Sequence, residues 1–345
     1  MKKVFVIMLA ALLALSLGTG LAEGVVNVFN WEDYINEDVI KMFEEETGIK
    51  VNYMRFTLNE DMMVQVRTSP GSFDVVFPSD YAIERMIAED LVQPIDFDKV
   101  PNAAQILDWL QTPDYDPDHK YSVPYMWGTV GILYNTTKVE EPITSWGQLF
   151  DEKYKDQVFM MDSPRDTLGI ALKYLGYSVN SKNPAEIQEA ANLLIEQKQK
   201  GIVKAYQVDE TKDKMVAGEA ALALVWSGDA QYAINLNPDL AYVVPEEGSN
   251  VWVDGMVITK TAANPDNAHA FIDFLSRPEI AAMNVEYIEY STPNKGAIEL
   301  LGDDYIDNPN LNPGMDVIEN CEFFHDNHDV KVLYDTYWGM VKNAK

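Results

Sequence analysis

Aromatic and carboxylate side chains recur together at the ends of four short apolar runs. The groups are Trp31, Asp33 and Tyr34; Ser79, Asp80 and Tyr81; Trp226 and Asp229; and Trp252 and Asp254. A single such group has a simple structural explanation, because an aromatic staple and a first-turn acid both support the start of a helix. That explanation does not account for the repetition. Four groups in one chain indicate a shared binding surface.

Ring faces with carboxylates between them suit an aliphatic chain that carries ammonium groups. The methylenes would pack on the rings, at roughly 25 cal/mol for each Å² of apolar surface buried. Each ammonium would gain on the order of 0.5–2 kcal/mol from a ring face, and charge-assisted hydrogen bonds to carboxylates would hold the ends. Because an acid buried without a cation is costly, we expect the empty site to be open and wet.

Motifs for catalysis or metal binding are weak. The sequence has no G-x-S-x-G, no glycine-rich phosphate loop and no H-E-x-x-H. Acids and tryptophans also occur together in glycosidases, so a secreted carbohydrate-active enzyme remains an alternative. "DYDPDH" lacks the glycine of a calcium loop, and His325 and His328 in "HDNHD" fit a solvated loop better than zinc. We predict no enzymatic activity, no cofactor and no metal site.

The elements that must position these residues alternate between strands and helices. Strands are expected over 25–29, 49–54, 73–77 and 221–225, and helices after Asn36, near Tyr81, over "NPAEIQEAANLLIEQKQ" and after Asn264. Alternation of this kind favours an α/β chain with open parallel sheets. In such sheets ligands bind beyond the carboxyl ends of the strands, which is where the aromatic and acidic groups occur.

Composition and the amino terminus indicate an exported, acidic protein. Lys2 and Lys3 precede an apolar run and small residues near Ala22, so we predict a cleavable signal peptide over 1–22 without a lipidation cysteine. The only cysteine, Cys321, excludes an internal disulfide. The chain has 26 basic and 55 acidic residues, a net charge of −29. Nucleic acid is therefore a poor partner, whereas cations are attracted. A length of 345 residues favours two domains.

Seven segments, in order along the chain, resemble a known family. They are "FNWEDYI", "ETGIKV", "FDVVFPSDY", "YSVPYMWGT", "TSWGQLF", "WVDGMVI" and "STPN". Across essentially the whole mature sequence the chain resembles the spermidine/putrescine-binding proteins of ABC importers. The resemblance implies a two-lobed periplasmic-binding-protein fold of type II, with crossover strands at "TVGILYNT" and "DGMVITK" and a ligand cleft between the lobes. The implied lobes are 25–131 with 256–302, and 132–255 with 303–345.

The resemblance also implies which residues bind the polyamine. They are Trp31, Asp33, Tyr34, Ser79, Tyr81, Asp166, Trp226, Asp229, Trp252, Asp254, Tyr290 and Phe324. Asp254 is expected to be the central partner of an ammonium group. The implied protein partner is the membrane permease of the importer, and a monomer is the simplest form in which to meet it.

Departures from the family pattern bear on which polyamine binds. Ser163 and Phe324 stand where spermidine-preferring members have an acid and a glutamine. Asp33 and Asp229 resemble the putrescine-preferring arrangement, whereas the aromatic walls look like the spermidine type. With fewer acids at the distal end, a third ammonium is less well paired, which favours putrescine. The alternative is a binding protein of the same fold for another cationic or small organic solute.

Overall fold

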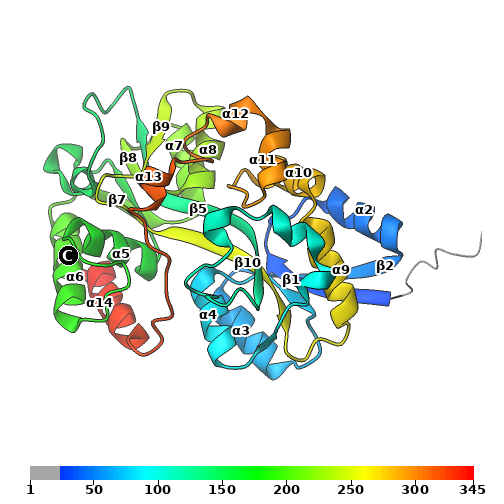
Figure 1. Cartoon of the computed structure of the whole chain (residues 1–345). Helices are drawn as coiled ribbons and strands as arrows, with labels where there is room; N and C mark the ends of the chain where they lie inside the picture. Colours follow the sequence, from blue (N-terminus) through cyan, green and yellow to red (C-terminus); the bar gives the residue numbers. More distant parts are fainter. Residues whose placement is uncertain (1–23) are drawn as a thin grey trace, which may run out of the picture.

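The computed structural model describes residues 24–345. The predicted signal peptide, residues 1–22, lies outside the described residues. Within 24–345, no helix is both long enough and apolar enough to cross a membrane. Figure 1 shows two α/β bodies side by side, joined by long strands that run between them.

The first group of elements alternates strands with helices. Its members are β1 (Gly24–Trp31), α2 (Glu37–Thr47), β2 (Ile49–Phe56), α3 (Asn59–Thr68), β3 (Val75–Val76), α4 (Asp80–Ala88) and β4 (Val92–Gln93). β1 pairs in parallel with β2 and with β3. The predicted helix after Asn36 is confirmed: the Asn36 side chain accepts a hydrogen bond from the Asp38 N–H, and the helix ends at Gly48 with φ 74°.

Two long strands connect this group to the rest of the molecule. They are β5 (Ser122–Asn135) and β10 (Val251–Thr259), which pair antiparallel with each other. Three short helices precede β5 in the chain, namely η1 (Phe97–Lys99), η2 (Pro101–Gln105) and η3 (Asp108–Leu110). The predicted crossover segments "TVGILYNT" and "DGMVITK" lie largely within β5 and β10. β10 also pairs with β3 and β4, so it ties the first group to β5.

The second group surrounds the carboxyl half of β5. Its members are η4 (Trp146–Phe150), η5 (Glu152–Tyr154), β6 (Val158–Met161), α5 (Pro164–Tyr174), α6 (Pro184–Gln199), β7 (Val203–Gln207), α7 (Glu210–Val216), β8 (Leu222–Trp226), α8 (Ser227–Leu236) and β9 (Leu240–Val243). β6 pairs in parallel with β7 and β8, whereas β5 is antiparallel to β8 and β9.

The sheet is therefore mixed, and the expectation of parallel sheets holds only for the two outer parts. Its path is β2-β1-β3-β10-β5-β8-β6-β7, with β4 on β10 and β9 on β5. The two central strands run antiparallel to their neighbours. The sequence pattern suggested that Trp252 and Asp254 follow a strand. In the structure they lie instead at the start of β10. Because β10 is antiparallel to β3, its amino end still reaches the edge where β1 and β3 have their carboxyl ends.

The remaining helices pack around both groups. They are α9 (Pro265–Leu275), α10 (Pro278–Ile288), α11 (Lys295–Leu301), α12 (Asp303–Ile306), α13 (Met315–Ile318) and α14 (Lys331–Asn343). α14 returns to the second group and packs against α6 and α5 (Figure 1). α9 begins after Asn264, as predicted, but the Asn264 side chain donates to Asp74 and does not cap the helix amides.

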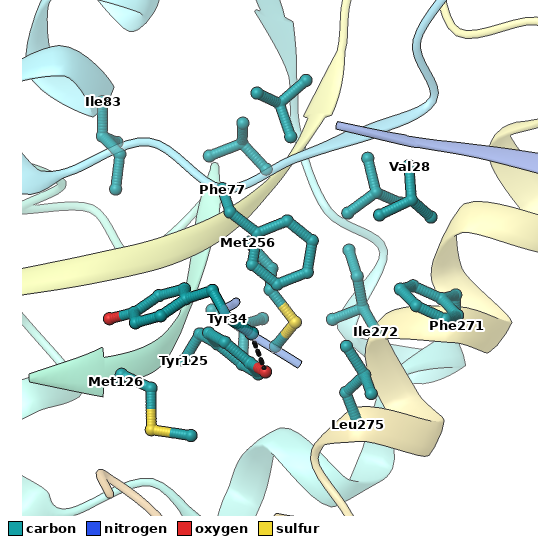
Figure 2. Close-up of a cluster of buried hydrophobic side chains, with 14 of the residues drawn as sticks. Val28, Tyr34, Phe77, Ile83, Tyr125, Met126, Met256, Phe271, Ile272 and Leu275 are labelled. Carbon is teal, nitrogen blue, oxygen red and sulfur yellow. Dashed lines mark hydrogen bonds between the residues drawn. The ribbon is translucent and has the colours of Figure 1, made fainter. Parts of the chain in front are cut away.

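Separate hydrophobic clusters lie on the two sides of the molecule. The first contains β1, β3, α4, α9 and the amino half of β5, and the others lie around β6, β8 and α5. Figure 2 shows part of the first, where the Tyr125 hydroxyl donates to the Tyr34 carbonyl at 2.8 Å. Tyr305, Leu311 and Ile318 also belong to the first cluster, so its packing continues beyond residue 302. The lobe boundaries stay a prediction.

Candidate functional site

Asp254 lies at the centre of a buried hydrogen-bonded group. Its carboxylate accepts from the Tyr34 hydroxyl at 2.8 Å and from the Ser79 hydroxyl at 2.6 Å. The antiparallel run of β10 produces this contact, since Ser79 and Asp254 form an isolated β-bridge. Burial raises the pKa of Asp254 to about 6, while the two hydrogen bonds act in the opposite direction. Among the described residues no cation contributes to the pKa of Asp254, so its carboxylate has no counter-charge.

Asn59 supports this centre and was not predicted. Its side-chain amide donates to the Ser79 hydroxyl at 3.1 Å and to the Tyr81 hydroxyl at 3.0 Å, and its oxygen accepts from the Ser79 N–H at 3.2 Å. The residue is only 4% exposed. Asn59 follows β2, so the rule that sites lie beyond strand ends, applied to that strand as well, would have pointed to it.

Aromatic rings extend from the carboxylate toward the second group of elements. Tyr290 meets Tyr34 at 6.1 Å between ring centroids and Trp252 at 5.1 Å, both edge to face. Two glycines make room for these rings. A Cβ at Gly228 would lie 2.2 Å from the Tyr290 ring, and one at Gly128 would lie 2.6 Å from Trp252. The indole N–H of Trp252 is buried without a protein partner.

Trp31 and Asp33 lie farther from the centre. Trp31 is half-buried against Phe56, with ring centroids 4.4 Å apart, and its indole N–H also has no protein partner. Asp33 is exposed and adopts a φ of 49° in the turn after β1. No described contact joins Asp33, which follows β1, to Asp254 in β10. The structure therefore does not bring these two acids together.

A second buried acid, Asp166, comes from the other side of the site. It lies in the first turn of α5 and accepts from the Ser163 hydroxyl at 2.5 Å. Burial raises its pKa, while hydrogen bonding from Ser163, the charge of Arg165 and hydrogen bonding from Trp226 lower it. Trp226 therefore faces Asp166, whereas the sequence pattern had grouped it with Asp229. Asp166 is 7% exposed.

Asp229 differs from the other acids because it already has a cation. The Lys212 ammonium lies 3.2 Å from its carboxylate. Burial raises the pKa of Asp229, and Lys212 opposes that rise. The sequence suggested Asp229 as an acid for the ligand, whereas the structure engages it in an ion pair. The spacing of Asp229 from Trp226 could not reveal a lysine on α7.

Phe324 and Tyr81 both contact an unpredicted cation, Arg165. The guanidinium carbon lies 4.3 Å from the Phe324 ring centroid and 5.4 Å from that of Tyr81. Both terminal nitrogens of Arg165 donate to the His325 carbonyl at 3.1 Å. The only sequence signal was a basic residue beside Asp166 in "DSPRDT".

Asp80 is fully buried between these groups. Burial raises its pKa to about 8, hydrogen bonds from the Tyr81 and Val253 amides lower it, and nearby Asp254 raises it further. The carboxyl is thus mainly neutral at pH 7. It was part of the sequence pattern, and burial favours its neutral form.

A contact between α4 and the segment before α14 lies next to the Arg165 stack. One oxygen of Glu84 accepts from the Asp326 N–H at 2.8 Å and lies 3.2 Å from the His325 ring nitrogen. Glu84, with smaller contributions from Asp114 and Asp80, raises the pKa of His325, while partial burial lowers it. This contact joins two segments that are 241 residues apart.

Taken together, these residues favour binding of a cation with an apolar stem. Two buried carboxylates, Asp254 and Asp166, carry raised pKa values, and a ligand cation would compensate their charge. Aromatic faces adjoin both. Within residues 24–345, no group of three or more His, Cys, Asp or Glu side chains is arranged to hold a metal ion.

Comparisons with known proteins agree with this chemistry. A family model described as bacterial extracellular solute-binding protein matches residues 38–313. The spermidine/putrescine-binding periplasmic protein of Salmonella typhimurium is 34% identical over 96% of this chain and 97% of that protein. A putrescine-binding periplasmic protein of Escherichia coli is 31% identical over 89% and 88%. A Streptococcus pneumoniae spermidine/putrescine ABC transporter substrate-binding protein, solved with calcium and HEPES, is 37% identical, covering 92% and 98%, with a TM-score of 0.84.

Proposed function

Because the chain belongs to the family of bacterial extracellular solute-binding proteins, we propose that it is a polyamine receptor for an ABC importer. In this proposal an extracytoplasmic protein takes up putrescine or spermidine between its lobes and delivers it to a membrane permease. The observation that carries the proposal is the Asp254 carboxylate, 7% exposed, held by two hydroxyls and left without a cation among aromatic rings.

The proposed ligand pose follows from the contacts. One ammonium binds Asp254 and lies against Tyr34, which also donates to that carboxylate. The methylene chain runs along Trp252 and Tyr290, whose rings meet edge to face. A second ammonium reaches Asp166 beside Trp226. Each contact adds either apolar burial or a charge-assisted hydrogen bond, so diamines are favoured over uncharged solutes.

Lobe closure would trap the ligand and form the surface that meets the permease. The lobe ranges 25–131 with 256–302, and 132–255 with 303–345, are part of this proposal, as are the cleavable leader over 1–22 and the monomeric state. The Glu84 contact with His325 and Asp326 bridges the two proposed lobes and would hold the closed form. The relatives are transport receptors, which supports a role without catalysis.

Isothermal titration of the mature protein tests the proposal. The protein is stripped of bound ligand by unfolding and refolding, and putrescine, spermidine and cadaverine are titrated in turn. Saturable one-to-one binding of at least one polyamine with micromolar affinity or better is expected. The absence of heat from all three ligands, with a protein shown to be folded, would refute polyamine binding and leave another cationic or small organic solute. Turnover of a chromogenic glycoside would instead support a carbohydrate-active enzyme.

A further inference from the structure

α8 carries small and amide side chains along one face. Gly228, Gln231 and Asn235 are spaced i, i+3 and i+7, so they lie on the same side of the helix. The helix begins directly after Trp226, and a Cβ at Gly228 would lie 2.2 Å from the Tyr290 ring. The first turn of this face therefore adjoins the aromatic wall of the site, and the following turns carry the two amides.

Gln231 is the buried centre of this face and is only 7% exposed. Its side-chain oxygen accepts from the Asn308 amide at 2.9 Å and from the Asn310 amide at 3.1 Å. Its own amide donates to the Asn235 side-chain oxygen at 2.7 Å. The glutamine is therefore hydrogen bonded at both its oxygen and its nitrogen, as a buried polar side chain requires.

The two asparagines that reach Gln231 belong to the other side of the molecule. They lie between Tyr305 and Leu311, and both of these residues pack in the first hydrophobic cluster. Ala230, which precedes Gln231 on α8, packs in a cluster of the second group. The hydrogen bonds of Gln231 therefore join the two hydrophobic cores, wherever along the chain the lobe boundary is drawn.

A second branch leads from Gln231 to the residue before Tyr290. The Asn235 amide donates to one carboxylate oxygen of Glu289 at 3.1 Å. Glu289 ends α10 in the left-handed region, with φ 61°. A residue other than glycine holds such a conformation only where its surroundings support it. The bond from Asn235 thus helps to fix the backbone from which the Tyr290 ring extends.

We propose that Gln231 is a positioning residue, which joins α8 to the 308–310 loop and, through Asn235, to the residue before Tyr290, so that one set of amides both places the Tyr290 ring and holds the closed form. This inference deepens the proposed polyamine function and rests on it. Because water competes for each of these hydrogen bonds, each contributes little net free energy, and closure stays reversible. The set shares no residue with the Glu84 contact.

Stopped-flow tryptophan fluorescence, which measures association and release of putrescine, tests this role. In Gln231→Met the side chain keeps its length and its burial but loses its hydrogen bonds. We expect release to become roughly tenfold faster, the size of one or two net hydrogen bonds, with association within about twofold of the parent. Release at the parent rate in the folded variant would overturn the inference.

A double-mutant cycle with Asn310 shows whether the contact acts in the ligand-bound protein. Among residues 24–345 the Asn310 side chain hydrogen bonds only Gln231. Asn310→Ala alone should speed release about threefold. The double variant should release no faster than Gln231→Met, because that substitution has already removed the shared bond. Effects that multiply in the double variant would show that the two residues do not act together, and would count against the inference.

Gln197→Met is the matched control. Gln197 is also a buried glutamine, 2% exposed, and it donates to the Leu149 carbonyl at 2.8 Å within the second group. Its replacement should lower the unfolding temperature and leave the release rate unchanged. If Gln197→Met speeds release as much as Gln231→Met does, the effect is general destabilisation and the inference fails.

Failure of the proposed function gives a different result. If no polyamine binds the unaltered protein, the polyamine function fails, and the inference fails with it. If the unaltered protein binds putrescine but the Gln231 and Asn310 variants release it at the parent rate, only the inference fails. If circular dichroism shows that Gln231→Met does not fold, Asn310→Ala decides the question by its own release rate, because Asn310 is partly exposed in a loop.

Discussion

Replacing Asp254 by asparagine should separate ligand affinity from stability. Asparagine has nearly the same size, and its amide can still hydrogen bond the hydroxyls of Tyr34 and Ser79, which lie 2.8 and 2.6 Å from the carboxylate. What it removes is the negative charge. A buried ammonium that loses its counter-charge costs roughly 3 kcal/mol or more, so putrescine should bind at least about 100-fold more weakly.

The same change should not destabilise the ligand-free protein. The pKa of Asp254 rises from 3.8 to about 6 on folding, and such a rise corresponds to a cost of about 3 kcal/mol for keeping the carboxylate charged at pH 7. Asparagine avoids that cost. We therefore expect the ligand-free variant to unfold at the same temperature as the parent or at a higher one, by up to several degrees.

The assay combines titration calorimetry with thermal unfolding, each with and without putrescine at pH 7.5. Asp80→Asn is the matched control, because Asp80 is buried nearby and its burial favours the neutral form. The affinity of this variant for putrescine should stay within about threefold of the parent. The reasoning is refuted if Asp254→Asn binds putrescine within about twofold of the parent. Weak binding together with a large fall in the unfolding temperature of the ligand-free variant would assign Asp254 a structural role instead.

Three further predictions concern the same site. Trp252→Ala should weaken putrescine binding roughly tenfold to 100-fold in calorimetry, through lost methylene packing and cation–π attraction, and unchanged affinity would remove Trp252 from the ligand wall. The folded-state pKa of Asp254 is raised from 3.8 to about 6. The stability that protonation of Asp254 adds to the ligand-free protein is therefore fully present below pH 3.8 and is lost as pH rises through 6. Because putrescine binds the charged carboxylate, the rise in unfolding temperature that putrescine causes should be large above about pH 7 and should decline below about pH 6. Glu84→Gln keeps an acceptor for the Asp326 amide but loses the charge facing His325, so stopped-flow release of putrescine should become severalfold faster with little change in association rate; equal release rates would show that this contact does not hold the closed form.

Local sequence rules determined most of the elements. Asn36 and Gly48 bound a helix as capping rules predict, and the apolar runs before Trp31 and Trp226 form strands. These features depend on side chains only a few residues apart. The ordered set of motifs also indicated the family, because it samples the whole chain at once.

Pairings within the site could not be predicted from local patterns. The sequence placed Asp229 with the ligand, but Lys212 of another helix reaches it. The only local signals were the position of Asn59 after a strand and that of Arg165 beside Asp166, and neither shows which side chains they contact. Asp33 shares the pattern of the other acids, yet the turn after β1 leaves it exposed.

The sequence by itself determined that this chain is an acidic α/β protein with aromatic and acidic residues at the ends of its strands. Only the tertiary structure decided which acids remain without a cation. Tyr34 and Ser79 meet Asp254 across separations of 220 and 175 residues because β10 runs antiparallel to β3. Electrostatic pairing depends on distance in space and on burial, and both are set by the strand order of the folded sheet.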